Sequence, residues 1–228
     1  MSRILTFYRT SKGKKVVMAF SGAGLLGFGM TNMIGNLKFY QGPEAMNAYA
    51  RFLREMGTPL FSHESLLWIA RVTLLTSVFA HIVTAIQLAK GNRQARPTDY
   101  KKTQFVASSY AARTMVWSGP ILAAFVIFHI MHLTTGWVHP SFNPDDVYQN
   151  LVRGFQVWYV SAFYIVAMLG LGYHMIHGVW SLLQSLGLNN TRYDALIRRF
   201  AVAVTAAAVV GTISFPVYRK SVVWGKMV

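Results

Sequence analysis

Cysteine is absent from this 228-residue sequence, and acidic residues are scarce. Without a thiol, the chain has no disulfide, no cysteine-bound iron–sulfur cluster and no zinc finger. Charged residues make up 13% of the chain, against roughly 25% in an average soluble domain. The chain is also 54% hydrophobic, with a mean hydropathy of +0.36. These values exclude a disordered chain, a collagen and a disulfide scaffold, and they argue against a soluble globular protein.

Long apolar runs with almost no charge occur five times along the chain. A membrane-spanning helix needs about 20 predominantly apolar residues. The sequence therefore predicts an all-α membrane protein, one domain over residues 1–228, with five transmembrane helices. We expect these helices near residues 16–37, 65–89, 112–137, 154–185 and 198–218. Because the number of spans is odd, the two termini are expected on opposite sides of the membrane.

The net charge of +15 comes from 22 Lys and Arg against 7 Asp and Glu. Lys and Arg favour cytoplasmic loops in membrane proteins. They are about twice as frequent in the N-terminal segment and in the second and fourth loops as on the other side. The bias predicts a cytoplasmic N-terminus. Since this charge follows the topology, we do not expect a nucleic-acid partner.

The first loop on the far side carries a helical pattern near residues 43–56. Pro43 suits the first turn of a helix. Apolar residues then recur at helical spacing, at Met46, Tyr49, Phe52, Leu53 and Met56. Two interpretations remain open: a helix lying at the membrane interface, or one packed across the end of the bundle.

Five of the seven histidines lie inside predicted spans, namely His81, His129, His132, His174 and His177. Ionisable residues are rare within membranes and usually face the interior of the bundle. Neutral imidazole is a common axial ligand of haem iron. The alternative is that these histidines only form hydrogen bonds to neighbouring helices. A metal site made of the i, i+3 pairs alone is disfavoured because no carboxylate lies nearby.

The depth of the histidines in the predicted helices separates them into two levels. The second and fourth helices run in the same direction, and His81 and His174 lie about 16 and 19 residues into them. These two can face each other across one haem. His129 lies about 17 residues into the third helix, near the other face of the membrane, where Asn32 has the matching depth in the first helix. The sequence thus predicts a complete inner pair and an incomplete outer pair.

A haem also carries two propionates, which need cations or hydrogen-bond donors near the membrane surface. Arg113, Arg71 and Lys15 are the candidates in this sequence. Each has an alternative role, because Lys and Arg near the ends of spanning helices also extend to the lipid headgroups or set the topology.

Several short motifs occur in a characteristic order. They are SKGKKVVM at 11–18, GPEAMN at 42–47, His81 followed by NRQARP at 92–97, Arg113 sixteen residues before His129, HMIHGVWS at 174–181 and GLNN at 187–190. With them, the chain resembles the cytochrome b membrane-anchor subunit of succinate:quinone oxidoreductases. The form it resembles is the single-chain, five-helix, b558-type form found in bacterial succinate dehydrogenases and fumarate reductases.

The resemblance implies a subunit that passes electrons between an iron–sulfur subunit and a membrane quinone, usually menaquinone, through b-type haem. It also implies a bacterial inner-membrane location in respiratory complex II, with a flavoprotein and an iron–sulfur subunit on the cytoplasmic face, and the option of a higher oligomer. Succinate chemistry belongs to the flavoprotein, so no residue of this chain is catalytic for succinate. His81 and His174 take the inner-ligand positions, and His129 takes the outer position of the third helix.

The outer ligand expected from the first helix falls on Asn32, and an amide is a poor ligand for haem iron. Three outcomes are open: the outer haem is lost, His129 holds it alone, or His132 takes part in a shifted site. His177 is a further candidate near the inner haem. For the quinone, His63 and Glu64 are outer candidates, and the region near Arg113 is the inner one.

Two functions compete with this interpretation. One is a b-type cytochrome that anchors another respiratory dehydrogenase, such as a hydrogenase or formate dehydrogenase. The other is a membrane scaffold without a cofactor.

Overall fold

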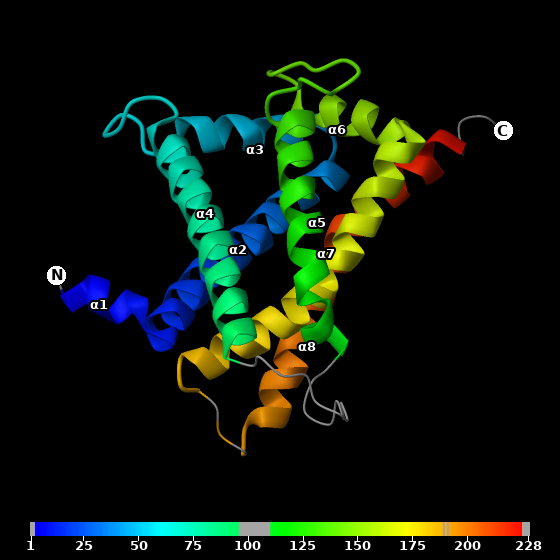
Figure 1. Cartoon of the computed structure of the whole chain (residues 1–228). Helices are drawn as coiled ribbons and strands as arrows, with labels where there is room; N and C mark the ends of the chain where they lie inside the picture. Colours follow the sequence, from blue (N-terminus) through cyan, green and yellow to red (C-terminus); the bar gives the residue numbers. More distant parts are fainter. Residues whose placement is uncertain (1–2, 96–109, 189, 191, 225–228) are drawn as a thin grey trace.

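The structure is a computed structural model that describes residues 3–95, 110–188, 190 and 192–224, with the backbone alone at residues 4, 110–113 and 219–224. Within these ranges it is helical and contains no strand. Five helices are long and apolar enough to cross a membrane, which confirms the predicted fold class and number of spans (Figure 1). They are α2 (Ser11–Asn36), α4 (Ser65–Gln94), α5 (Tyr110–Leu133), α7 (Trp158–Ser185) and α8 (Asp194–Trp224).

Four shorter helices lie near the ends of the bundle. They are α1 (Arg3–Arg9), η1 (Leu37–Gln41), α3 (Pro43–Glu55) and α6 (Val147–Gln156). Figure 1 shows α3 and α6 lying across one end of the bundle, whereas α1 lies toward the other. We call these the α3/α6 end and the α1 end. The chain enters α2 at the α1 end and leaves α8 at the α3/α6 end, as expected for an odd number of spans.

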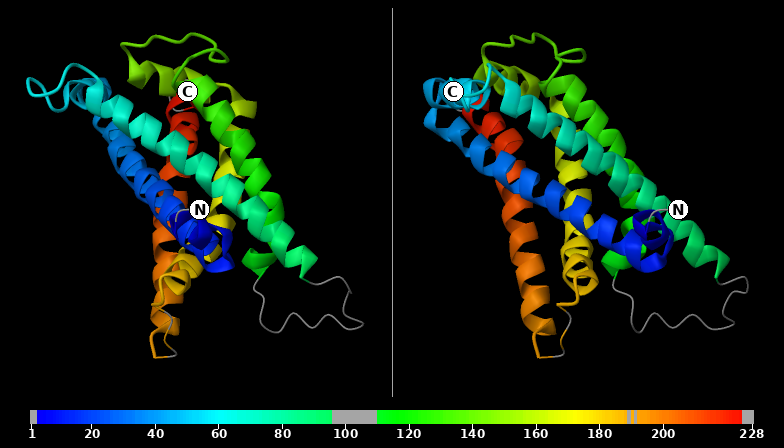
Figure 2. Two further views of the ribbon diagram at one scale, coloured as in Figure 1. Left: turned by 60° about the vertical axis from the view of Figure 1, so that its left-hand side comes forward. Right: turned by 90° about the vertical axis from the view of Figure 1, so that its left-hand side faces the viewer.

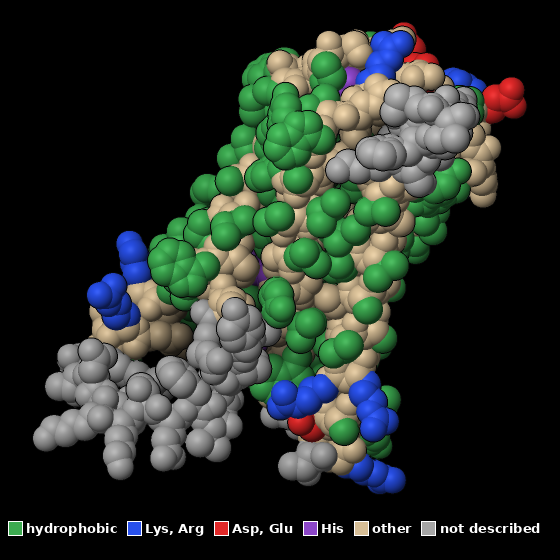
Figure 3. Space-filling view, turned by 90° about the vertical axis from the view of Figure 1, so that its right-hand side faces the viewer, with side chains coloured by type: hydrophobic (Ala, Val, Ile, Leu, Met, Phe, Trp, Pro, Cys, Tyr) green, Lys and Arg blue, Asp and Glu red, His purple; other side chains and the backbone are tan. Residues whose placement is uncertain are grey.

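Helix α7 is the centre of the bundle, since it packs against α8, α5, α2 and α6, while α2 also packs along α4 (Figure 2). The outward side chains of the long helices are largely apolar. Leu75, Phe79 and Trp117, for example, are each about 70% exposed. Hydrophobic side chains cover most of the flank in Figure 3. Contiguous apolar surface of this extent is expected of a lipid-facing protein.

Local capping explains several of the helix boundaries. The Thr10 hydroxyl accepts a hydrogen bond from the Gly13 amide at 3.0 Å and begins α2. Gly42, with a φ of 99° that suits glycine, turns the chain into Pro43 at the first position of α3. The Asp146 carboxylate accepts from the Gln149 amide at 3.0 Å and begins α6. These are the residue types that helix N-termini favour.

The expectation of one helix over residues 154–185 is wrong at its start. Residues 154–156 belong to α6, and Val157 is extended, with φ −73° and ψ 109°. The Ser161 hydroxyl donates to the Phe155 carbonyl at 2.7 Å, so the break leaves this buried carbonyl satisfied. Helix α6 is amphipathic and buries Leu151, Val152 and Phe155 against the bundle. A short apolar face next to a spanning helix therefore looked like a continuation of that helix.

The ends of the other spanning helices also differ from the predicted ones, because the prediction followed only the runs without charged residues. Helices α2, α4 and α8 extend into polar segments beyond those runs, and α5 ends at Leu133 instead of residue 137. Gly136, with a φ of 76°, lies in the turn that follows α5. A helix carries on into water as long as its backbone is satisfied, so polarity alone does not mark its end.

Helix α3 forms where the pattern at 43–56 predicted it and packs across the end of the bundle. Its Asn47 side-chain NH₂ group donates to the Asp146 carboxylate at 3.0 Å. The side-chain oxygen of Asn47 accepts from the Tyr148 backbone amide at 3.1 Å. Arg54 donates to the Pro144 carbonyl at 2.8 Å. The two end helices are thereby tied to each other and close one end of the bundle.

Candidate functional site

His81 on α4 and His174 on α7 form the most site-like pair in the bundle. Each is the seventeenth residue of its helix, and both helices run from the α3/α6 end toward the α1 end. Their ring centroids lie 6.3 Å apart, with 57° between the ring planes. The matched depth predicted from the sequence therefore brings these two imidazoles together.

Each imidazole of this pair has a serine partner on a different helix. The Ser21 hydroxyl on α2 lies 3.2 Å from His81 Nδ1, and the Ser118 hydroxyl on α5 lies 3.1 Å from His174 Nδ1. Four helices thus meet at this level of the bundle. We call this arrangement the serine-paired site, made of His81, His174, Ser21 and Ser118.

Each serine hydroxyl also has a backbone acceptor on its own helix. The Ser21 hydroxyl lies 2.8 Å from the Val17 carbonyl, and the Ser118 hydroxyl lies 3.4 Å from the Met115 carbonyl. A serine that donates to its own helix can accept from a histidine whose Nδ1 bears hydrogen. In that tautomer the Nε2 lone pair of each ring is left for a metal, which is the way second-shell partners orient metal-ligating histidines.

The residues of the serine-paired site fit a haem iron held by two histidines. Metal-bound imidazole nitrogens lie about 2 Å from the metal. Two rings bound on opposite sides of one ion therefore have their centres about 6 Å apart, as His81 and His174 do. Gly22 lies beside the His81 ring, since a Cβ at this glycine would be 3.4 Å from His81 Cε1. Among the described residues, no group of three or more His, Cys, Asp or Glu side chains is placed to hold a metal ion by itself.

The other residues that the sequence suggested for an inner haem lie at different levels. His177 is one turn beyond His174, and its ring packs on Trp180 with centroids 6.2 Å apart. Lys15 is exposed near the start of α2, six residues before Ser21. Arg113 lies in the first turn of α5, where its side chain is outside the described residues. Arg71 lies near the α3/α6 end, where its guanidinium stacks on Trp68 at 4.7 Å.

A second group of histidines lies near the α3/α6 end. His129 and His132 on α5 share one partner, the Tyr164 hydroxyl on α7, at 3.3 and 3.1 Å from their Nδ1 atoms. His139, in the loop after α5, packs on His132 with ring centroids 5.0 Å apart. The His139 Nε2 atom bonds to the Asn150 carbonyl on α6 at 2.8 Å. We call His129, His132, His139 and Tyr164 the Tyr164 cluster.

Asn32, the position that the sequence places opposite His129, is exposed on α2. Its side-chain oxygen accepts a hydrogen bond from the Asn36 amide at 3.0 Å. Asn32 lies eleven residues after Ser21, and His129 lies eleven residues after Ser118. Eleven residues are about three helical turns and about 16 Å. Asn32 and His129 therefore share helix faces with the two serines, one level closer to the α3/α6 end.

The outer quinone candidates line a polar pocket of about 390 Å³ at the α3/α6 end, together with Arg51, Arg54, Glu55, Pro144 and Asp145. Glu64 pairs with Arg54 at 3.5 Å and with Arg71 at 3.9 Å. Its φ of 61° is unusual for a residue other than glycine. His63 lies in the same pocket. His63 and Glu64, adjacent in the sequence, thus line this pocket together with charged groups, and its lining includes no residue of the Tyr164 cluster.

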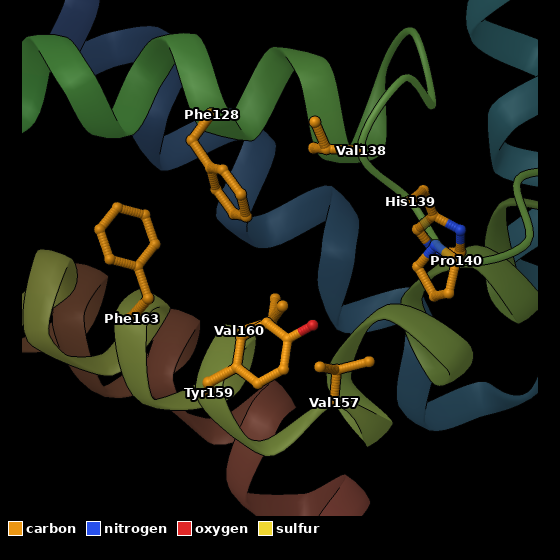
Figure 4. Close-up of a pocket in the computed structure, with 8 residues that line it drawn as sticks. All are labelled: Phe128, Val138, His139, Pro140, Val157, Tyr159, Val160 and Phe163. Atoms are coloured by element: carbon orange, nitrogen blue, oxygen red, sulfur yellow. The ribbon is translucent and has the colours of Figure 1, made fainter.

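A larger cleft of about 570 Å³ opens between α5, the loop that follows it and the start of α7. Figure 4 shows Phe128 and Phe163 facing each other across it, with His139 and Pro140 farther along. Most of its lining is apolar. The cleft borders the Tyr164 cluster, because Phe128 stacks on His132 with centroids 5.5 Å apart.

Sequence reasoning missed the hydroxyl partners of both groups, Ser21, Ser118 and Tyr164, and it missed His139. In the sequence, Ser21 belongs to the run of small residues Ser21-Gly22-Ala23-Gly24, which suits either close helix packing or room for a flat macrocycle. Small residues do mark close helix contacts, but which histidine such a serine meets depends on how the helices are rotated.

Comparison with known proteins gives one family. The family model described as succinate dehydrogenase/fumarate reductase transmembrane subunit matches residues 90–215, which is more than half of the chain. The matched range includes Ser118, His129, Tyr164 and His174 and begins after His81. No curated protein matches, and no solved structure matches.

Proposed function

The chain belongs to the family of succinate dehydrogenase/fumarate reductase transmembrane subunits. From this premise we propose that it carries electrons between an iron–sulfur subunit and a membrane quinone. The electrons would pass through a haem b at the serine-paired site. As a family member with five apolar helices, it is a multi-pass membrane subunit of such a complex. The observation that carries the electron-transfer role is the 6.3 Å spacing of His81 and His174.

The residues of the chain would contribute binding and orientation at this site. His81 and His174 supply two neutral imidazole nitrogens, and Ser21 and Ser118 hold their rings in place. A haem held by these two imidazoles would supply one-electron transfer at this position. Arg113 and Lys15 lie five and six residues before the two serines, on the α1 side, where they are the candidates for the propionates. His177, one turn beyond His174, is a further ionisable residue near this site.

The charge distribution supports an α1 end that faces the cytoplasm of a bacterial cell. Basic residues gather at that end, namely Arg3, Arg9, Lys12, Lys14, Lys15, Lys90, Arg93, Arg192, Arg198 and Arg199. Five of the seven acidic residues lie at the other end, namely Glu44, Glu55, Glu64, Asp145 and Asp146. Figure 3 shows part of this separation. The pattern follows the positive-inside rule, and it suits docking of an iron–sulfur subunit, with its flavoprotein, on the cytoplasmic face.

The quinone, which we take to be menaquinone, has two candidate locations. One is the polar pocket with His63 and Glu64 at the α3/α6 end. The other is the α1 end near Arg113, close to where the iron–sulfur subunit would dock. No residue of this chain is proposed to act on succinate.

The test is purification of the affinity-tagged chain from membranes in mild detergent. We expect it to retain a flavoprotein and an iron–sulfur subunit and to show a b-type haem spectrum that succinate reduces. Co-purification with a hydrogenase or formate dehydrogenase instead would support the other respiratory anchor. A colourless complex from haem-replete cells would leave only the scaffold function.

A further inference from the structure

The Tyr164 cluster differs from the serine-paired site in the number of hydroxyl groups available. Tyr164 has one hydroxyl proton, and two histidine Nδ1 atoms lie within 3.3 Å of its oxygen. The hydroxyl can donate to only one of them, so the other must donate its own N–H to the tyrosine oxygen. His129 and His132 are therefore bridged to each other through Tyr164 and do not face each other across a space.

His132 has no room for a metal at its other nitrogen. It is fully buried, with 0% of its surface exposed, and its Nε2 atom lacks a hydrogen-bond partner. A Cβ built on Gly154 of α6 would lie 2.9 Å from this Nε2 and 2.7 Å from Cε1. The backbone of α6 thus covers the edge of the ring where an iron would have to bind. This geometry removes the shifted outer site based on His132.

His129 keeps a possible ligand nitrogen but lacks a second ligand. Within the described chain, its aromatic neighbours are Phe125, with centroids 5.8 Å apart, and Tyr164. On α2, one level beyond Ser21, lies Asn32, whose side-chain oxygen already accepts a hydrogen bond from the Asn36 side-chain amide. An amide oxygen is a far weaker ligand for haem iron than imidazole. The residues at the level of His129 do not fit a haem held by two histidines.

From these contacts we infer that the chain holds a single haem, at the serine-paired site, and that the Tyr164 cluster occupies the level of the second haem as a hydrogen-bonded packing unit. This inference rests on the proposed function. It also selects between the two quinone locations. With one redox centre toward the α1 end, electrons that enter from the iron–sulfur subunit leave in the same half of the membrane. The quinone is therefore reduced near the α1 end and not in the pocket of His63 and Glu64.

The test compares the haem-to-chain ratio of the intact complex with that of four variants. We expect a ratio near one and a single component in a redox titration of the haem absorbance. His129→Gln should leave the ratio at one, whereas His81→Ala should lower it to near zero. Tyr159→Phe, an exposed tyrosine on α7, is the matched control for Tyr164→Phe, and both should keep the ratio at one.

The outcomes that overturn the inference are distinct from those that overturn the proposed function. A ratio near two that falls to one in His129→Gln would show a second haem held by His129. A ratio near zero in the unaltered complex would remove the haem and the electron-transfer role together. If His129→Gln is recovered poorly with its partner subunits, His129→Asn serves as the second variant, and the redox titration of the unaltered complex still distinguishes one component from two.

Discussion

Each half of the bundle places two buried or half-buried histidines beside hydroxyl groups of other helices. One pair is arranged to bind a metal, whereas the other forms a hydrogen-bonded packing group. Toward the α1 end, two separate serines hold His81 and His174, and the two rings face each other 6.3 Å apart. Toward the α3/α6 end, one tyrosine holds both His129 and His132. Closeness of histidines alone therefore does not define a metal site. What matters is whether each ring has its own partner and what its remaining nitrogen faces.

The largest effect is expected from breaking the pair itself. Replacing His174 with alanine leaves one axial ligand and should lower the haem content of the complex more than tenfold, measured as the reduced-minus-oxidised absorbance per chain. His63→Ala, outside the spanning helices at the other end, should leave the absorbance unchanged. Retention of a full haem complement in His174→Ala would contradict the assignment of the ligands.

A second variant makes the α3/α6 half of the bundle more like the α1 half. Asn32→His places an imidazole on the helix face that carries Ser21, at the level of His129. We expect the haem-to-chain ratio to rise from one toward two, with a second component in the redox titration. An unchanged ratio would mean that the packing around Tyr164, and not the missing ligand, closes this level to haem.

A smaller effect is expected when a serine partner is removed. Ser21→Ala frees the His81 ring to rotate and leaves its Nδ1–H without this acceptor. Loss of such second-shell partners typically costs about 10–100-fold in metal affinity. The rate of haem transfer to a scavenging apo-globin measures this change. Ser77→Ala is the matched control on α4, because the Ser77 hydroxyl donates only to the Thr73 carbonyl of its own helix, at 2.8 Å.

The smallest effect is expected at the polar pocket. Glu64→Gln removes two long ion pairs between partly exposed side chains, and such pairs contribute about 0–1 kcal/mol. The thermal midpoint of the complex and its rate of quinone reduction should both stay near those of the unaltered protein. A large loss of quinone reduction with normal haem content would instead place the quinone at this pocket.

Much of the fold follows from the sequence, because lipid demands about 20 apolar residues per span. The same spacing along helices gives the depth match of His81 and His174. Other features depend on rotation and tilt, which spacing does not specify. Ser21 and Tyr164 meet histidines 60 and 35 residues away. His139, in the loop after α5, packs on His132 and is held by the Asn150 carbonyl of α6, a contact that helical spacing does not specify.

The shared register of α2 and α5 also has an evolutionary meaning. Asn32 and His129 follow the two serines by the same eleven residues, so the scaffold for a second level is already in place. Histidine and asparagine codons differ by a single base. One base change is therefore enough to convert Asn32 into the histidine that this second level lacks.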